Sequence, residues 1–205
     1  VAGIFENVYR PGHAHQSWSP GNVATARVVG RAHRNLENYT ASKFPYLVTF
    51  LFKPFFSTAI NNYGQGGYFK VLVCNTDMES TGAINGIGFG FMFADFNNGY
   101  PGTGEGANQI EIYNSGGYEK TDTFTFTSDT WYNVRAYIDS TSVKVKIWTG
   151  PEPDEWTVEK TDITGFAESG NNLYLGFHDS VGSTNSGATV CTYINNLKIY
   201  QGMPQ

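Results

Sequence analysis

Charged residues are scarce in this chain. Lysine, arginine, aspartate and glutamate make up 15% of its 205 residues, whereas an average soluble domain has roughly 25%. Disordered segments and long solvent-exposed helices both depend on charged side chains, so neither is expected to dominate. The 13 basic residues face 18 acidic ones and form no dense basic patch. Because neutralising phosphates requires such a patch, we expect no nucleic-acid partner.

Long apolar runs and cysteines are also scarce. A membrane-spanning helix needs about 18 or more consecutive apolar residues, and the richest apolar segment, 44–56, contains Lys53 and two prolines. We therefore expect no membrane span. Cys74 and Cys191 are the only cysteines, and their spacing matches neither a metal site nor a redox motif. Two interpretations of them stay open: two unpaired, mostly buried thiols, or one disulfide.

Aromatic residues and glycines are abundant instead. Aromatic residues make up 16% of the chain, and there are 24 glycines. Aromatic and β-branched side chains suit a pleated, half-buried surface, while glycine, asparagine and aspartate suit turns. Apolar residues recur at every second position, and the helical period of 3.6 residues does not recur. These features predict a chain of strands and turns, long enough to bury its own core as one domain.

Period-two alternation predicts about eleven strands, separated by turn residues. They cover residues 24–33, 45–52, 67–74, 84–93, 109–113, 123–127, 130–139, 142–148, 156–160, 172–178 and 189–200. Because no amphipathic helix separates consecutive strands, the predicted fold class is all-β, with two antiparallel sheets packed as a β-sandwich. Residues 1–23 have few core-like features and are predicted to form an N-terminal arm, while residues 24–205 form a single sandwich domain.

Three segments in the last part of the chain carry a family resemblance. They are WYNVRAYIDSTSVKVKIWTGPEPDEW at 131–156, LYLGFHDS at 173–180 and YINNLKIYQG at 193–202. In this order and spacing they resemble the concanavalin A-like lectin and glucanase superfamily, which includes laminin G-like and carbohydrate-binding domains. The earlier part of the chain agrees with this superfamily only in its succession of short strands and turns. The resemblance implies a two-sheet antiparallel jelly roll, but function belongs to the site that a fold carries.

The resemblance also raises the question of glucanase activity. Retaining glucanases of this superfamily carry their acids at alternating positions of one strand, as Glu-x-Asp-x-Glu, because a nucleophile and a proton donor must flank the glycosidic bond. The corresponding strand here reads Gln109-Ile110-Glu111-Ile112-Tyr113, so Glu111 is its only carboxylate. One acid cannot serve in both roles. A polysaccharide-degrading enzyme is therefore the least favoured function.

A calcium site is implied by the resemblance alone. Several superfamily members hold a structural calcium between the first strand and the closing strand, at the positions of Glu6 and Asn195 in this sequence. The usual aspartate is Asn195 here, so one negative charge is missing and calcium affinity is expected to be low. Calcium is the one cofactor that the sequence suggests.

Sugar binding needs aromatic faces for the apolar side of a pyranose and polar groups for its hydroxyls. Strand parity predicts which side chains point away from the core, and it supplies such groups on several strands. The candidates are Lys70, Gln109, Glu111, Tyr113, Trp131, Arg135 and His178. Gly88 and Gly90 are expected to form the low floor of a groove with walls of Tyr113, Glu111, Gln109, Arg135 and Lys70. We expect this groove to hold a polysaccharide or another glycan.

Two functions follow from these patterns. The first is a non-catalytic, lectin-like carbohydrate-binding domain. The second is a structural or adhesion domain of a larger assembly, such as a phage fibre or a capsid-decorating protein, which would bind other chains. The chain begins at Val1 without a leader, as expected of a mature secreted protein or of a domain cut from a longer one. Either function predicts an extracellular, cell-surface or virion-surface location.

Overall fold

The computed structural model describes residues 3–4, 26–35, 44–56, 66–74, 86–93, 108–114, 117–164, 174–183 and 190–201. Within these ranges the regular structure is all strand, and no helix is present that could span a membrane. The strands are β1 Gly3–Ile4, β2 Ala26–Asn35, β3 Tyr46–Phe56, β4 Gly66–Cys74, β5 Gly86–Phe93, β6 Gln109–Asn114, β7 Gly117–Thr123, β8 Tyr132–Ile138, β9 Val143–Trp148, β10 Val158–Lys160, β11 Tyr174–Ser183 and β12 Val190–Gln201.

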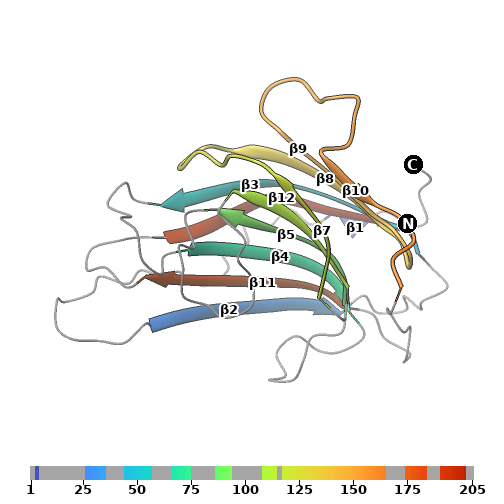
Figure 1. Cartoon of the computed structure of the whole chain (residues 1–205), viewed down its shortest axis with the longest axis horizontal. Helices are drawn as coiled ribbons and strands as arrows, with labels where there is room; N and C mark the ends of the chain where they lie inside the picture. The colour runs from blue at the N-terminus through green and yellow to red at the C-terminus, as the bar shows by residue number, and fades with distance from the viewer. Residues whose placement is uncertain are drawn as a thin grey trace.

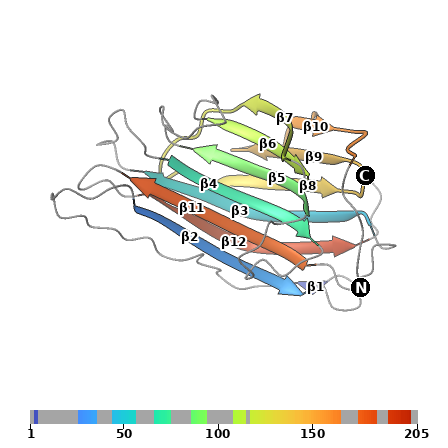
Figure 2. The ribbon, with the colours of Figure 1, turned by 60° about the horizontal axis from the view of Figure 1, so that its bottom comes forward.

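These strands form two antiparallel sheets of six (Figure 1). Sheet A has the order β1-β12-β3-β8-β9-β10, and sheet B has the order β2-β11-β4-β5-β6-β7. Figure 2 shows the strands of sheet B running side by side in this order. The prediction of an all-β, two-sheet antiparallel sandwich is confirmed.

The core lies between the two sheets and is rich in phenylalanine. Alternation along β3 puts Phe50 and Phe52 on the inner face of sheet A, where both are buried. Phe69 of β4 and Phe91 of β5 meet them from sheet B, with ring centroids 5.4 Å and 4.9 Å from that of Phe52. Aromatic pairs at such distances contribute about 0.5–1.5 kcal/mol each beyond their area burial. Because side chains alternate along a strand, this packing also fixes which residues point away from the core.

A hairpin joins β8 and β9, between the strands predicted at 130–139 and 142–148. Ile138 pairs with Val143, and the backbone N–H of Asp139 donates to the carbonyl oxygen of Ser142 at 2.8 Å. Oδ1 of Asp139 accepts the N–H of Ser140 at 2.7 Å, a contact by which aspartate favours turns. The structure therefore confirms that the chain turns between these two predicted strands.

The strand predicted at 123–127 is wrong, because the pairing strand in this region is β7, which ends at Thr123. Beyond it, Phe126 is buried in the core and Phe124 packs against the core, with ring centroids 4.9 Å apart. Their backbone N–H groups do not join a ladder but donate to Asn108, to its carbonyl oxygen at 2.8 Å and its side-chain oxygen at 3.1 Å. An apolar alternation therefore marks buried side chains here without marking a strand.

The expected N-terminal arm is described only at residues 3–4. These residues form β1, which pairs with β12 of sheet A, with Gly3 opposite Ile199. This short piece therefore belongs to the sandwich, while residues 5–25 lie outside the described residues and the boundary after residue 23 stays a prediction. Cys74 ends β4 in sheet B, and Cys191 lies on β12 in sheet A. Their side chains lie outside those described, so both interpretations of the cysteines stay open.

Candidate functional site

The seven ligand residues predicted from the sequence lie on both sheets. Those of sheet B are Lys70 on β4, Gln109, Glu111 and Tyr113 on β6, and His178 on β11. Those of sheet A are Arg135 on β8 and Trp131, directly before that strand. The core separates the sheets, so residues that point away from it on one sheet cannot share a groove with those on the other. The single groove expected from the sequence does not form.

On sheet B, four of these residues form a group that we call the Glu111 cluster: Lys70, Gln109, Glu111 and Tyr113. Gly90 of β5 pairs with Lys70 on one side and with Glu111 on the other, so these two residues flank the glycine. The backbone of His178 pairs with that of Lys70, one strand further along. The side chain of His178 lies outside those described, and its predicted role stays a prediction.

Gly90 does not leave the low floor that the sequence suggests. A Cβ atom at this position would lie 2.8 Å from Cε2 of Tyr113 and 3.1 Å from Cγ of Lys70. The ring of Tyr113 and the stem of Lys70 therefore already fill the space above the glycine. Nζ of Lys70 lies 3.5 Å from the centroid of this ring, in a cation–π contact.

Burial changes the interpretation of the Glu111 cluster further. Tyr113 is only 4% exposed and Glu111 is fully buried, although both point away from the sandwich core. A ring with so little exposed surface offers no face on which a sugar can stack. Strand parity gives the direction of a side chain but not what covers it, so the exposed face predicted for Tyr113 is wrong.

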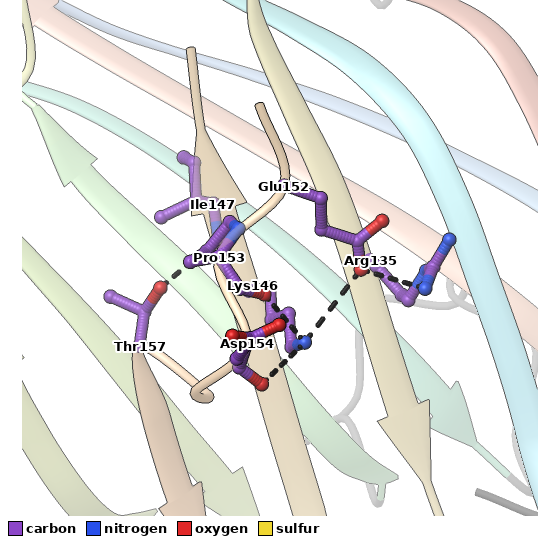
Figure 3. A network of polar contacts seen from close by, with 7 residues as sticks. All are labelled: Arg135, Lys146, Ile147, Glu152, Pro153, Asp154 and Thr157. Carbon is purple, nitrogen blue, oxygen red and sulfur yellow. Dashed lines mark hydrogen bonds and ion pairs between the residues drawn. The ribbon is translucent and has the colours of Figure 1, made fainter. Parts of the chain in front are cut away.

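On sheet A, Arg135 belongs to a polar network with the loop that joins β9 to β10 (Figure 3). Its Nη1 lies 2.7 Å from Oε1 of Glu152. Lys146, on the neighbouring strand, donates from Nζ to the carbonyl oxygens of Pro153 and Asp154, both at 2.8 Å. These contacts attach the loop to the outer face of the sheet. Arg135 thus has a structural partner, and its predicted role as a donor to sugar hydroxyls loses support.

The end of the same loop is fixed to β9. The backbone N–H of Ile147 donates to Oγ1 of Thr157 at 3.1 Å, and the N–H of Thr157 donates to the carbonyl oxygen of Val145 at 2.9 Å. Nζ of Lys146 also lies 5.1 Å from the ring centroid of Trp156. Trp156 therefore helps to hold the loop on the sheet.

Beside this network, the outer face of sheet A carries an aromatic and polar surface that we call the Trp131 patch. Its first row consists of Tyr193 on β12, Lys53 on β3 and Trp131, with Asp129 next to them. Nζ of Lys53 lies 5.3 Å from the ring centroid of Trp131, 4.8 Å from that of Tyr193 and 2.6 Å from Oδ1 of Asp129. Trp131 is 42% exposed, and it is the one large hydrophobic side chain among those described that is exposed.

The second row of the patch lies one step along the same strands. Backbone pairing joins Asn195 to Leu51, Leu51 to Asn133, and Asn133 to Trp148. These four residues alternate with core residues, so they point away from the core, and all are partly exposed. The patch therefore combines indole and phenol rings, two amides and an ion pair on one rigid sheet face.

The sequence does not predict Lys53 or Tyr193 as site residues. The available signal was the position of Lys53, which interrupts an apolar strand at a place where alternation with Phe52 directs its side chain outward. Tyr193 joins it only through the pairing of β3 with β12, and strand pairing across a sheet is not encoded in local periodicity.

The predicted calcium ligands are described only in part. β1 pairs with β12, so the first strand and the closing strand are neighbours as expected. Oδ1 of Asn195 accepts the N–H of Asn196 at 2.8 Å, where β12 bulges. Glu6 lies outside the described residues. In the part of the chain that the structure describes, no three His, Cys, Asp or Glu side chains come together to hold a metal ion, and calcium stays a prediction.

No family model and no curated protein sequence matches the chain. Solved structures, in contrast, share its architecture over nearly its whole length. Lectin II from Ulex europaeus has a TM-score of 0.59 at 14% identity, over 98% of this chain and 90% of that one. The winged bean acidic lectin, in complex with methyl-α-D-galactose, has a TM-score of 0.58 at 14% identity, over 98% and 94%. Peanut lectin has a TM-score of 0.54 at 14% identity, over 100% and 99%.

The chain therefore has the concanavalin A-like jelly-roll fold, as the sequence resemblance implied. At this level of identity the likeness shows the fold alone, because one fold carries many functions. The choice of a site must rest on the side chains of this chain.

Proposed function

We propose that this protein is a non-catalytic, lectin-like domain that binds glycans through the Trp131 patch. The observation that carries the proposal is the exposed indole of Trp131, 42% accessible, beside the ion pair of Lys53 and Asp129 on a sheet face. A pyranose presents an apolar face of C–H groups and a rim of hydroxyls, so it needs an aromatic ring and polar groups at fixed positions next to each other.

The patch supplies both parts. Trp131 offers the apolar surface, and Asp129 offers carboxylate oxygens that accept hydrogen bonds from hydroxyls. The amide of Asn133, which lies in the second row, both donates and accepts. Because Lys53 is held between two rings and a carboxylate, the polar part is organised before a ligand arrives, which lowers the entropic cost of binding.

The fold adds support of a general kind, since the structures with which it superposes include the winged bean acidic lectin in complex with a galactoside. Glycans that such a domain binds are found outside cells, on cell surfaces and on virions. We extend the proposal to these locations.

The test is a glycan array followed by calorimetry on the strongest ligand. If a pyranose covers on the order of 60 Å² of the indole, at roughly 25 cal/mol per Å², Trp131→Ala should weaken binding by about 1.5 kcal/mol, or about tenfold. The matched control is Trp156→Ala, which removes an indole from the loop between β9 and β10, outside the patch. We expect the affinity of this control to equal that of the parent.

Other outcomes contradict the proposal. Absence of any array signal, or equal affinity of parent and Trp131→Ala, would remove the patch as a glycan site. If Trp131→Ala instead abolished a concentration-dependent self-association measured by sedimentation, the patch would be a contact between chains. That result would favour the structural or adhesion domain of a larger assembly.

Calcium at Glu6 and Asn195 is a separate proposal. A bound ion stabilises the folded state by mass action, so millimolar calcium should raise the melting temperature of the parent, and EGTA should lower it again. Glu6→Gln should abolish the calcium-dependent rise. Equal melting temperatures with calcium and with EGTA would remove the site, and repeating the array with EGTA would show whether glycan binding depends on the ion.

A further inference from the structure

The two charges of the Trp131 patch are not equally accessible. The side chain of Lys53 is 20% exposed and that of Asp129 is 64% exposed, although Nζ and Oδ1 lie only 2.6 Å apart. The ammonium group lies next to the rings of Trp131 and Tyr193, 5.3 Å and 4.8 Å from their centroids. A ligand that approaches Trp131 therefore meets the carboxylate before it meets the lysine.

The carboxylate is also fixed in place. Asp129 lies in a turn with a left-handed backbone, φ 60°, a conformation that aspartate tolerates better than most residues. Its backbone N–H donates to the carbonyl oxygen of Pro54 at 2.8 Å, and its side chain accepts a hydrogen bond from Nζ of Lys53. Pro54 and Lys53 are neighbours on β3. These two contacts to β3 hold the aspartate beside the indole.

From this asymmetry we infer that the Trp131 patch selects uncharged pyranosides and discriminates against acidic sugars such as uronic acids. The inference rests on the proposed function, since it concerns the ligand class of the same site. Asp129 accepts hydrogen bonds from free hydroxyls of a neutral sugar. A sugar carboxylate at that position meets the more exposed member of the ion pair, and because it lies nearer to Asp129 than to Lys53, the repulsion outweighs the attraction.

The size of the discrimination follows from Coulomb's law. Two like unit charges about 6 Å apart repel each other, and the positive charge of Lys53, slightly further away, offsets most of this repulsion, so that binding of the acidic sugar should weaken by about two- to threefold. The net charge of −5 on the chain acts in the same direction. Because the charges are exposed, added salt should reduce the discrimination.

The test compares sugars that differ only at C6. Methyl β-D-glucopyranoside and the corresponding methyl glucuronide form one pair, and the two galactose counterparts form another. Dissociation constants are measured by NMR titration at low and at high salt. The parent protein should prefer the neutral member of a pair by about two- to threefold, and the ratio of the two dissociation constants should approach one in high salt.

Three variants test whether Asp129 causes the preference for neutral sugars. Asp129→Asn should bring the ratio to one or below, because it removes the exposed charge and releases Lys53. Asp122→Asn, a control that removes one negative charge from an exposed ion pair on sheet B, should leave the ratio as in the parent. Trp131→Ala should weaken both members of a pair equally. Melting temperatures check that each variant is folded.

The outcomes separate the two proposals. Equal binding of neutral and acidic sugars, with both weakened by Trp131→Ala, would refute the charge selection and leave the glycan site in place. A preference that persists in Asp129→Asn would also refute it. If no sugar of either pair binds the parent, this inference fails, and only a blank glycan array would remove the proposed function as well.

Discussion

Replacing Gly90 by alanine should destabilise the fold through the Glu111 cluster. The new Cβ atom would lie 2.8 Å from Cε2 of Tyr113, closer than carbon atoms pack, and 3.1 Å from both Cγ of Lys70 and the carbonyl oxygen of Phe69. Tyr113 is 4% exposed and has little room to move away. Overpacking of this kind costs about 1–3 kcal/mol. We expect a loss of unfolding free energy in this range, measured by urea denaturation.

A double-mutant cycle tests the cause. In a Tyr113→Ala background the clash with the ring is gone, so Gly90→Ala should cost at least about 1 kcal/mol less than in the parent. Gly88→Ala is the control, because its Cβ would lie 2.1 Å from the backbone oxygen of Val71, which Tyr113→Ala does not relieve. An equal cost of Gly90→Ala in both backgrounds would refute the placement of the Tyr113 ring over Gly90.

The same variant also bears on function. Gly90 lies on sheet B and the Trp131 patch on sheet A, so Gly90→Ala should leave glycan affinity unchanged at temperatures where it stays folded. Lost affinity in the folded variant would return the Glu111 cluster to consideration as the binding site.

Three further changes test other parts of the structure. Arg135→Ala should cost less than about 1 kcal/mol in urea denaturation, because its ion pair with Glu152 is partly exposed, and it should leave glycan affinity unchanged. Phe52→Ala should cost about 3–5 kcal/mol in the same assay, since it empties a buried position between two sheets. Burial, with Asp139 adding to it, raises the pKa of Tyr137 above its ordinary value. The folded state thus disfavours the phenolate, so stability should fall above about pH 10. Tyr137→Phe should reduce that loss of stability. An absorbance titration of parent and variant would show whether the phenol of Tyr137 ionises at a higher pH than an ordinary tyrosine.

The strands of this fold were predictable where one face of each strand packs in the core. In β8 buried and partly exposed residues alternate throughout, and in β9 apolar core residues alternate with outward lysines, so the pattern marks both strands. The pattern failed at Phe124 and Phe126, which alternate but are held by Asn108 instead of a neighbouring strand. Periodicity reports burial, and a strand also needs partners that a local pattern does not contain.

The candidate site was less predictable for the same reason. Parity placed Tyr113 and Arg135 correctly on the sides of their strands that face away from the core. It could not show that these strands belong to different sheets, that Tyr113 is buried, or that Glu152 binds Arg135. The order of strands in a sheet and the burial of outward side chains both depend on contacts between residues far apart in the sequence. The pattern of a single sequence does not contain these contacts.

Two lysines show why the choice between the outer faces of the two sheets must rest on side-chain exposure. Lys70 and Lys53 each lie against an aromatic ring on the outer side of a sheet, 3.5 Å from the centroid of Tyr113 and 5.3 Å from that of Trp131. By residue type the two surroundings resemble each other, and both offer a cation, a ring and a carboxylate. In the first the carboxylate and the ring are buried, whereas in the second both are exposed. A sugar must cover an accessible ring and reach accessible polar atoms, and only the surroundings of Lys53 meet both requirements.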